Sequence, residues 1–175
     1  MEPVSALGAL CMAWAATAAA LDEPPPPVPL PGERVWPTRV VELSWTHSIE
    51  RVQGVETCAV PQPGAPSAAL RPLRVCLVGS GAGMEPAPQA RWRDGGYEWT
   101  PAEPVPRLPR AYSAFAADPT LCLDGRCAPL TVWMPQAAPA TGGVVRLRAC
   151  RVSCKGDGGI DGCHRMVMGA GHDGR

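Results

Sequence analysis

The 175-residue sequence lacks an excess of charge of either sign, and it has little helical periodicity and few phenylalanines or tyrosines. Sixteen basic and sixteen acidic residues give a formal net charge of zero, whereas nucleic-acid-binding proteins usually gather basic residues on one face. Beyond the first twenty residues, no stretch of ten has the clean period of an amphipathic helix. The charge balance argues against a nucleic-acid partner, and the missing period argues against a helical fold.

Proline, glycine and cysteine are abundant instead. The chain has 22 Pro and 19 Gly, which interrupt it too often for long helices and favour short strands joined by turns. Eight Cys stand beside one Phe and two Tyr, so we expect disulfide bonds to support a modest core. A length of 175 residues allows one domain of ordinary size with tails at its ends.

The N-terminal segment is typical of an export signal. Residues 4–20 are almost wholly apolar, and small residues precede a charged, proline-rich break. No Lys or Arg precedes the apolar run, so a short membrane anchor is the alternative to a cleaved signal. Cys11 follows Leu10 rather than a small residue, which argues against lipid attachment at this cysteine. We assign residues 1–20 to a signal peptide or N-terminal anchor.

Three further regions follow this segment. Residues 21–37 are a proline-rich linker of extended, polyproline type. Residues 38–153 are the β domain, in which the first three predicted strands are short (40–49, 52–60 and 73–78). Residues 154–175 are rich in glycine and poor in large apolar side chains, so we predict a disordered C-terminal tail.

The stretch "LCLDGRCAPL" predicts a hairpin closed by a disulfide bond. Asp124 and Gly125 are suited to a two-residue turn with positive φ angles. This turn sets Cys122 directly opposite Cys127 in a non-hydrogen-bonded pair, whose Cα atoms lie roughly 4.5 Å apart, near the short end of what a disulfide spans. We predict a Cys122–Cys127 bond rather than a metal site, which would need another pair of ligands close by.

A second hairpin is predicted in "ARWRDGGYEW", where two turns fit. The dipeptide "DG" at the turn sets Trp92 opposite Tyr97, and the dipeptide "GG" sets Trp92 opposite Trp99. Each register also places an arginine opposite Glu98. The sequence does not choose between them.

The other cysteines suggest one further bond. Cys58 and Cys76 lie in successive predicted strands, and a hairpin between these strands would bring the two thiols together as a second bridge. The C-terminal cysteines and a nearby histidine invite a zinc interpretation, but their spacing fits no closed zinc module (Cys150, Cys154, Cys163 and His164). We predict no metal and no cofactor.

His47 lies in the alternating stretch "RVVELSWTHSI" and has three interpretations. Alternation sets it on the same face as Leu43 and Trp45, while Ser48 and Glu50 point to the opposite face. A half-buried imidazole bonded to a backbone group is the first interpretation. A ligand-binding residue is the second, and a general base is the third.

The stretch "VGSGAGMEP" predicts a tight glycine turn whose backbone amides are able to accept an anion. Two prolines follow, so no helix starts there to bind a dinucleotide phosphate. Ser80 in this turn is the nucleophile that a catalytic His47 would need, with Glu50 or Glu56 orienting the imidazole. Glu56 is alternatively the partner of Arg51 in a surface ion pair.

Three stretches together resemble a bacterial family catalogued as domain of unknown function 1850: "LSWTHSIERVQGVET", "GSGAGMEPAPQARWRDGGYEWTPAEPVPRLP" and "LCLDGRCAPL" followed by "VRLRAC". The resemblance covers about residues 40–150. The positions that match its motifs are His47, Ser48, Glu50, Glu56, Ser80, Gly81, Gly83, Glu85, Cys122, Cys127 and Cys150. It implies a periplasmic or otherwise extracytoplasmic bacterial protein, associated with tripartite ATP-independent periplasmic (TRAP) transporters of the TAXI type, which take up small organic acids. It implies no catalytic residue.

We predict an all-β fold, a small antiparallel β-sandwich or partly open β-barrel with a disordered C-terminal tail. The function expected is a non-enzymatic binding or accessory module for TRAP-type organic-acid uptake, whose partners are TRAP transporter components or a small organic acid. Contact with a membrane is expected only through the N-terminal segment if it is not cleaved. The ligand-binding residues would be His47, Ser48, Glu50, Glu56, Ser80, Gly81, Gly83 and Glu85. A hydrolase that uses Ser80 with His47, or a purely structural envelope domain, are the alternatives.

Overall fold

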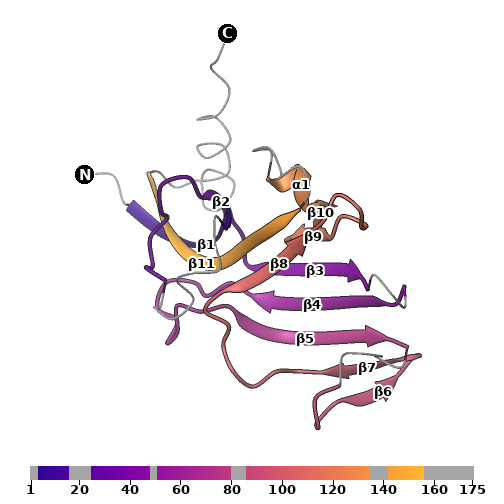
Figure 1. Cartoon of the computed structure of the whole chain (residues 1–175). Coiled ribbons are helices and arrows are strands. Elements are labelled where there is room, and N and C mark those ends of the chain that lie inside the picture. Colours follow the sequence, from indigo (N-terminus) through magenta and orange to yellow (C-terminus); the bar gives the residue numbers. More distant parts are fainter. Residues whose placement is uncertain (1–3, 16–24, 48–50, 80–85, 135–141, 156–175) are drawn as a thin grey trace.

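The computed structural model describes residues 4–15, 25–47, 51–79, 86–134 and 142–155, which form two antiparallel β-sheets (Figure 1). The all-β prediction is confirmed, and neither sheet closes into a barrel. The one described helix is a single turn, α1 (Leu130–Trp133). The frequent prolines and glycines explain this composition, since strands and turns tolerate interruptions that a helix does not.

The first sheet has four strands in the order β2-β1-β11-β8, and all its pairings are antiparallel. Its centre is the long pair of β1 and β11, which are in register over eleven residues of each strand. β8 forms one edge of this sheet. The strands are β1 (Val4–Trp14), β2 (Arg34–Pro37), β8 (Leu108–Tyr112) and β11 (Gly143–Lys155).

The second sheet has seven strands in the order β10-β9-β3-β4-β5-β7-β6. β3 and β4 occupy its middle and pair along seven residues. The strands are β3 (Val40–Thr46), β4 (Gln53–Ala59), β5 (Arg71–Val78), β6 (Arg91–Arg93), β7 (Gly96–Trp99), β9 (Thr120–Leu123) and β10 (Arg126–Pro129). The three strands predicted before residue 79 are therefore present in β3, β4 and β5.

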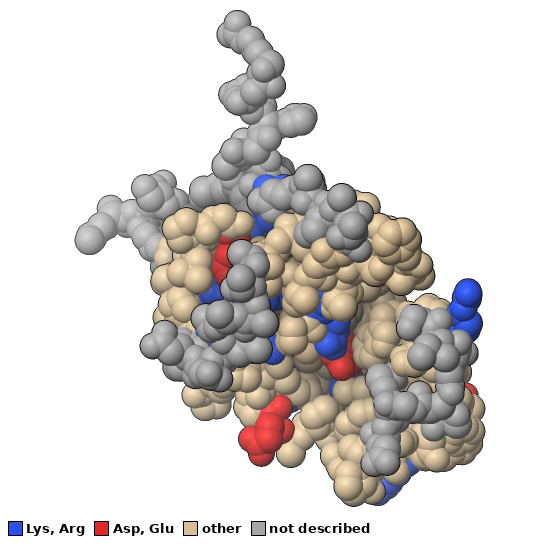
Figure 2. All heavy atoms as spheres, in the orientation of Figure 1, with Lys and Arg blue, Asp and Glu red and all other residues tan. Residues whose placement is uncertain are grey.

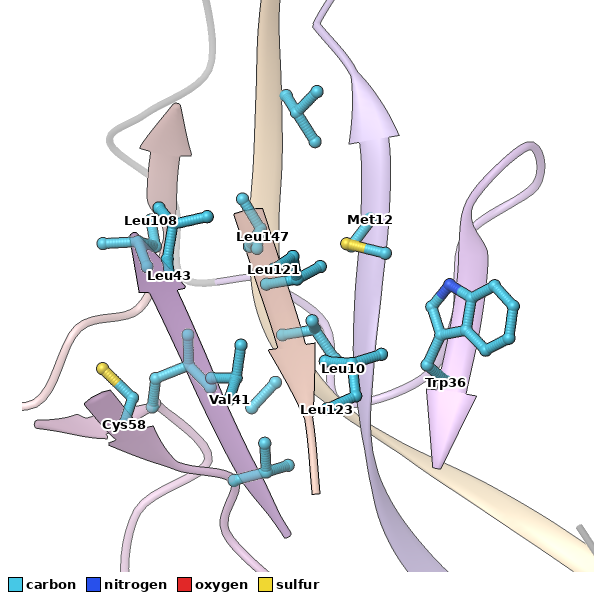
Figure 3. Close-up of a cluster of buried hydrophobic side chains, with 14 of the residues drawn as sticks. Leu10, Met12, Trp36, Val41, Leu43, Cys58, Leu108, Leu121, Leu123 and Leu147 are labelled. Carbon is cyan, nitrogen blue, oxygen red and sulfur yellow. The ribbon is translucent and has the colours of Figure 1, made fainter. Parts of the chain in front are cut away.

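The main core lies between the two sheets (Figure 3). Leu10 and Met12 of β1 are fully buried there against inward side chains of β3 and β9. Alternation produces this arrangement, because every second residue of a strand faces the same side. The inward residues of the second sheet in Figure 3 are Val41, Leu43, Cys58, Leu121 and Leu123.

Two segments that the sequence placed before the domain contribute strands to the fold. Residues 4–14, assigned to a signal or anchor, form β1, and residues 34–37, assigned to the linker, form β2. Successive side chains of β1 are buried on opposite faces of the first sheet. Leu10 belongs to the main core, and Cys11 belongs to a smaller apolar cluster on the other face. Removal of residues 1–20 as a signal stays a prediction. No helix among the described residues is long and apolar enough to cross a membrane.

The segment around residues 26–33 is tied to the first sheet by a buried ion pair. The Arg148 guanidinium on β11 bonds both carboxylate oxygens of Glu33, with 2.8 Å from Nε to Oε1. It also donates to the carbonyl oxygens of Pro26 and Val28, at 2.6 and 2.9 Å. Arg148 therefore holds part of the proline-rich linker against β11.

Both predicted hairpins are present. Asp124 and Gly125 take φ angles of 47° and 83° in the turn between β9 and β10, and Cys122 pairs with Cys127 as predicted. Their disulfide bond spans a Cα separation of 4.0 Å. Asp124 also accepts hydrogen bonds from two backbone amides at the start of β3 (Arg39 and Val40).

The register left open in the second hairpin is settled by its turn. Asp94 has a φ of 48°, and Trp92 of β6 pairs with Tyr97 of β7, so the "DG" turn is the one used. The two rings meet edge to face with their centroids 5.0 Å apart. Glu98 bonds Arg74 of β5 at 3.0 Å, so its ion pair is formed with the neighbouring strand.

The suggested Cys58–Cys76 bridge is wrong. The register of β4 and β5 places Cys58 opposite Pro72 and Cys76 opposite Val55, and both thiols are free. Cys11 of β1 instead bonds Cys150 of β11, across adjacent strands and 139 residues of sequence. Local sequence patterns do not predict this bond, because it depends on the contact between β1 and β11.

Candidate functional site

A groove of about 710 Å³ opens between the two sheets, beside the edge strand β8. Its walls come from the end of β3, the middle of β4, β8 and the loop that follows β8. We refer to it as the inter-sheet groove. Ligand sites in proteins typically enclose 300–1,000 Å³, so its size suits a small molecule. Its lining residues are Trp45, Thr46, His47, Glu56, Pro109, Arg110, Ala111, Tyr112, Ser113, Phe115, Ala116, Ala117 and Pro119.

The groove is the polar continuation of the core. On β8 the inward positions run from Leu108, which belongs to the core, to Arg110 and Tyr112. On β3 they run from Leu43 to Trp45. The same alternation that buries the apolar residues therefore aims the polar ones into the space between the sheets.

Arg110 is the central charged residue of the groove. Its guanidinium on the first sheet forms an ion pair with the Glu56 carboxylate on the second sheet, and it lies 5.2 Å from the centre of the Trp45 ring. One terminal nitrogen donates to the Pro109 carbonyl oxygen at 2.9 Å. The buried Nε–H has no acceptor among the residues that the structure describes. Burial lowers the pKa of Arg110 to about 10, so the side chain stays charged at neutral pH.

The position of Trp45 depends on Gly54, its partner on β4. A Cβ atom at residue 54 would lie 2.4 Å from the indole ring, so only glycine leaves room for the ring. The Arg110 guanidinium lies over the face of this ring in a cation–π contact. The groove therefore depends on residues of both strands.

His47 directly follows β3 and lines the groove, half-buried. Its backbone N–H donates to the Val52 carbonyl oxygen at 2.8 Å, and its own carbonyl accepts from Arg51 at 3.0 Å. Trp45, Thr46 and His47 all line the groove, so the predicted division of the strand into two faces stays a prediction at His47. A role in ligand binding stays a prediction.

The other predicted site residues divide into two groups. Glu56 lines the groove with His47, but the predicted ion pair with Arg51 is wrong, because Glu56 faces Arg110 between the sheets. The remaining six lie outside the described residues: Ser48, Glu50, Ser80, Gly81, Gly83 and Glu85. The described residues therefore bring together two of the eight.

A hydrolase would need a nucleophile beside His47 and a carboxylate to orient its imidazole. Glu56 is engaged by Arg110, while Ser80 and Glu50 lie outside the described residues. Among the described residues, no group of three or more Cys, His, Asp or Glu is arranged to hold a metal ion. What the groove offers is an anchored pair of opposite charges with aromatic and small apolar walls.

Arg110, Tyr112 and Phe115 are groove residues that the sequence analysis missed. They fall in or just after "PAEPVPRLPR", whose prolines favoured an extended connector. Leu108, Arg110 and Tyr112 alternate, which is the signal for a strand. Proline is tolerated here because β8 is an edge strand.

The architecture defines an antiparallel β-sandwich domain with a groove between its two sheets. A family described as Domain of unknown function (DUF1850) matches residues 41–130, and the chain belongs to this family. The matched part contains β3 from its second residue, β4 to β10, and every residue that lines the groove. No curated protein and no solved structure matches the chain.

Proposed function

We propose that this protein is an extracytoplasmic, non-enzymatic binding module that holds a small organic acid in the inter-sheet groove. The observation that carries the proposal is the placement of Arg110 and His47 in one groove of about 710 Å³ with aromatic walls. Arginine is well suited to a carboxylate, because its planar fork makes two parallel hydrogen bonds. The Arg110 side chain lines the groove and is 20% exposed, so a carboxylate is able to approach its guanidinium.

An oxidising compartment is part of the proposal. Two disulfide bonds join described strands, Cys11–Cys150 in the first sheet and Cys122–Cys127 in the second. Such bonds persist in the periplasm and outside the cell, and they are rare in the reducing cytosol. Because Cys11 lies in β1, this location requires an export route that leaves residues 4–14 on the mature chain.

We further propose that the module serves TRAP-type organic-acid uptake, either by delivering the acid or by contacting a transporter component. The support is the resemblance of three sequence stretches to a family whose members are associated with such transporters. The groove provides a place for the transported acid. A structural domain without a ligand is the competing possibility, and a binding measurement separates the two.

The test is isothermal titration calorimetry of the oxidised full chain against a panel of small organic acids. Replacing Arg110 by Gln removes the charge-assisted hydrogen bonds, each of which contributes about 1.5–3 kcal/mol, so affinity should fall at least about tenfold. Arg91→Gln is the matched control, since Arg91 is exposed on β6 at the far edge of the second sheet. A ligand that binds both variants as tightly as the wild type would remove the groove from the proposal.

A further inference from the structure

Among the three Arg–Glu ion pairs of the described residues, the two that are most buried differ in how accessible they are. The Arg148 and Glu33 side chains are 4% and 9% exposed, and Arg148 also bonds three backbone carbonyls. The Arg110 and Glu56 side chains are 20% and 24% exposed, and they line the inter-sheet groove. The first pair is enclosed and serves the fold, whereas a molecule in the groove is able to reach the second pair.

The pairing with Glu56 restricts which acids Arg110 is able to bind. A simple carboxylate that takes the Arg110 guanidinium competes with the Glu56 carboxylate for it. The displaced Glu56 would then be a partly buried anion beside a second anion, which is strongly unfavourable. A ligand that brings its own cation avoids this cost, because its cation replaces Arg110 as the partner of Glu56.

The walls of the groove indicate the rest of the ligand. Phe115, the only phenylalanine of the chain, lines the groove and is 88% exposed. Its loop is ordered by the Ser113 side chain and backbone, which accept hydrogen bonds from the amides of Phe115 and Ala116 at 3.2 Å each. An apolar group in the groove would gain contact with Phe115 and with the Tyr112 ring.

We infer that the ligand is a zwitterionic amino acid with an apolar side chain. Its carboxylate binds Arg110, its ammonium group binds Glu56, and its side chain packs between Tyr112 and Phe115. The two charges of an α-amino acid are adjacent, as are those of the Arg110–Glu56 pair. This inference rests on the proposed function and narrows the organic acid to one class.

The experiment compares three ligands that share one apolar body: phenylalanine, 3-phenylpropionate, which lacks the ammonium, and phenethylamine, which lacks the carboxylate. Calorimetry with the oxidised full chain should show phenylalanine binding at least about tenfold more tightly than either, the effect of one charge-assisted hydrogen bond. Glu56→Gln should lower the affinity for phenylalanine by a similar factor, and it should leave the affinity for 3-phenylpropionate unchanged or increase it. Glu98→Gln is the matched control, because Glu98 pairs with Arg74 on β5, outside the groove.

The outcomes separate this inference from the proposed function. If 3-phenylpropionate binds as tightly as phenylalanine and Glu56→Gln changes neither, the ligand is a simple carboxylate, so the inference fails while the proposed function stands. If no amino acid and no carboxylate binds the wild-type chain, both fail. Phe115 is exposed, so Phe115→Ala leaves the core intact. This variant should lower the affinity for phenylalanine at least about tenfold and the affinity for alanine much less. Equal losses for the two amino acids would remove Phe115 from the site.

Discussion

The bond between Cys11 and Cys150 should contribute far more to stability than the bond between Cys122 and Cys127. A disulfide restricts the unfolded chain, and the restriction grows with the length of the closed loop. The two bonds span 139 and 5 residues of sequence. The loop-entropy relation gives about 5 kcal/mol for the long loop and about 2 kcal/mol for the short one at 25 °C.

The packing of the two bonds increases the difference. Cys11 and Cys150 are 0% and 3% exposed, whereas Cys127 lies on the surface. Replacing both Cys11 and Cys150 by Ala therefore also removes buried sulfur atoms, which adds about 1 kcal/mol of lost packing. The chain should become marginally stable, since small domains are typically stable by about 5–15 kcal/mol in total.

The assay is urea unfolding followed by tryptophan fluorescence. The chain with Cys11→Ala and Cys150→Ala should lose about 5–6 kcal/mol of unfolding free energy, against about 2 kcal/mol for the chain with Cys122→Ala and Cys127→Ala. Near-equal losses from the two double variants would refute the reasoning, and so would a native wild-type protein with free thiols at residues 11 and 150.

Three further outcomes follow from the described contacts. Deleting residues 1–20 removes β1, with the fully buried Leu10 and Met12, so circular dichroism should show a chain without a cooperative unfolding transition; a cooperative transition near that of the full chain would contradict the place of β1 in the core. Gly54→Ala puts a Cβ 2.4 Å from the Trp45 ring, so it should cost about 1–3 kcal/mol in urea unfolding and lower ligand affinity. Gly64→Ala, which has open surroundings but a φ of 87°, should also lower stability while leaving affinity unchanged. Burial raises the pKa of the Cys58 thiol from 9.0 to about 11, so native Cys58 should resist iodoacetamide at pH 8. The pKa of the Cys58 thiol is higher in the folded chain than in the unfolded chain. The contribution of this neutral thiol to the free energy of unfolding is therefore complete below pH 9 and is lost as the pH rises to about 11. Labelling of Cys58 in the native chain as fast as in the urea-unfolded chain would contradict this burial.

The local features of the fold were predictable from the sequence. The Asp124-Gly125 turn determines its own hairpin, and hence the Cys122–Cys127 bond, within ten residues. Alternation in β3 determines that Leu43 and Trp45 share the face that packs on the core, because the period of a strand is two. These predictions depend only on neighbours in sequence.

The rest depended on contacts between distant segments. An apolar run such as residues 4–14 suits an export signal, an anchor or a buried strand, and only its pairing with β11 identifies the strand. Glu56 and Arg110 are 54 residues apart, and no local pattern relates one to the other. The groove was therefore missed, although two of its lining residues, His47 and Glu56, had been selected.

The most direct test of the groove is an NMR titration of the ¹⁵N-labelled, oxidised chain with phenylalanine. The Arg110 Nε–H, the Trp45 indole N–H and the amides of Ala111 to Phe115 should shift together and saturate with one dissociation constant. The amides of the β6–β7 hairpin, at the far edge of the second sheet, should stay in place. Shifts confined to that hairpin, or no saturable shift at Arg110, would contradict the account of the inter-sheet groove as the binding site.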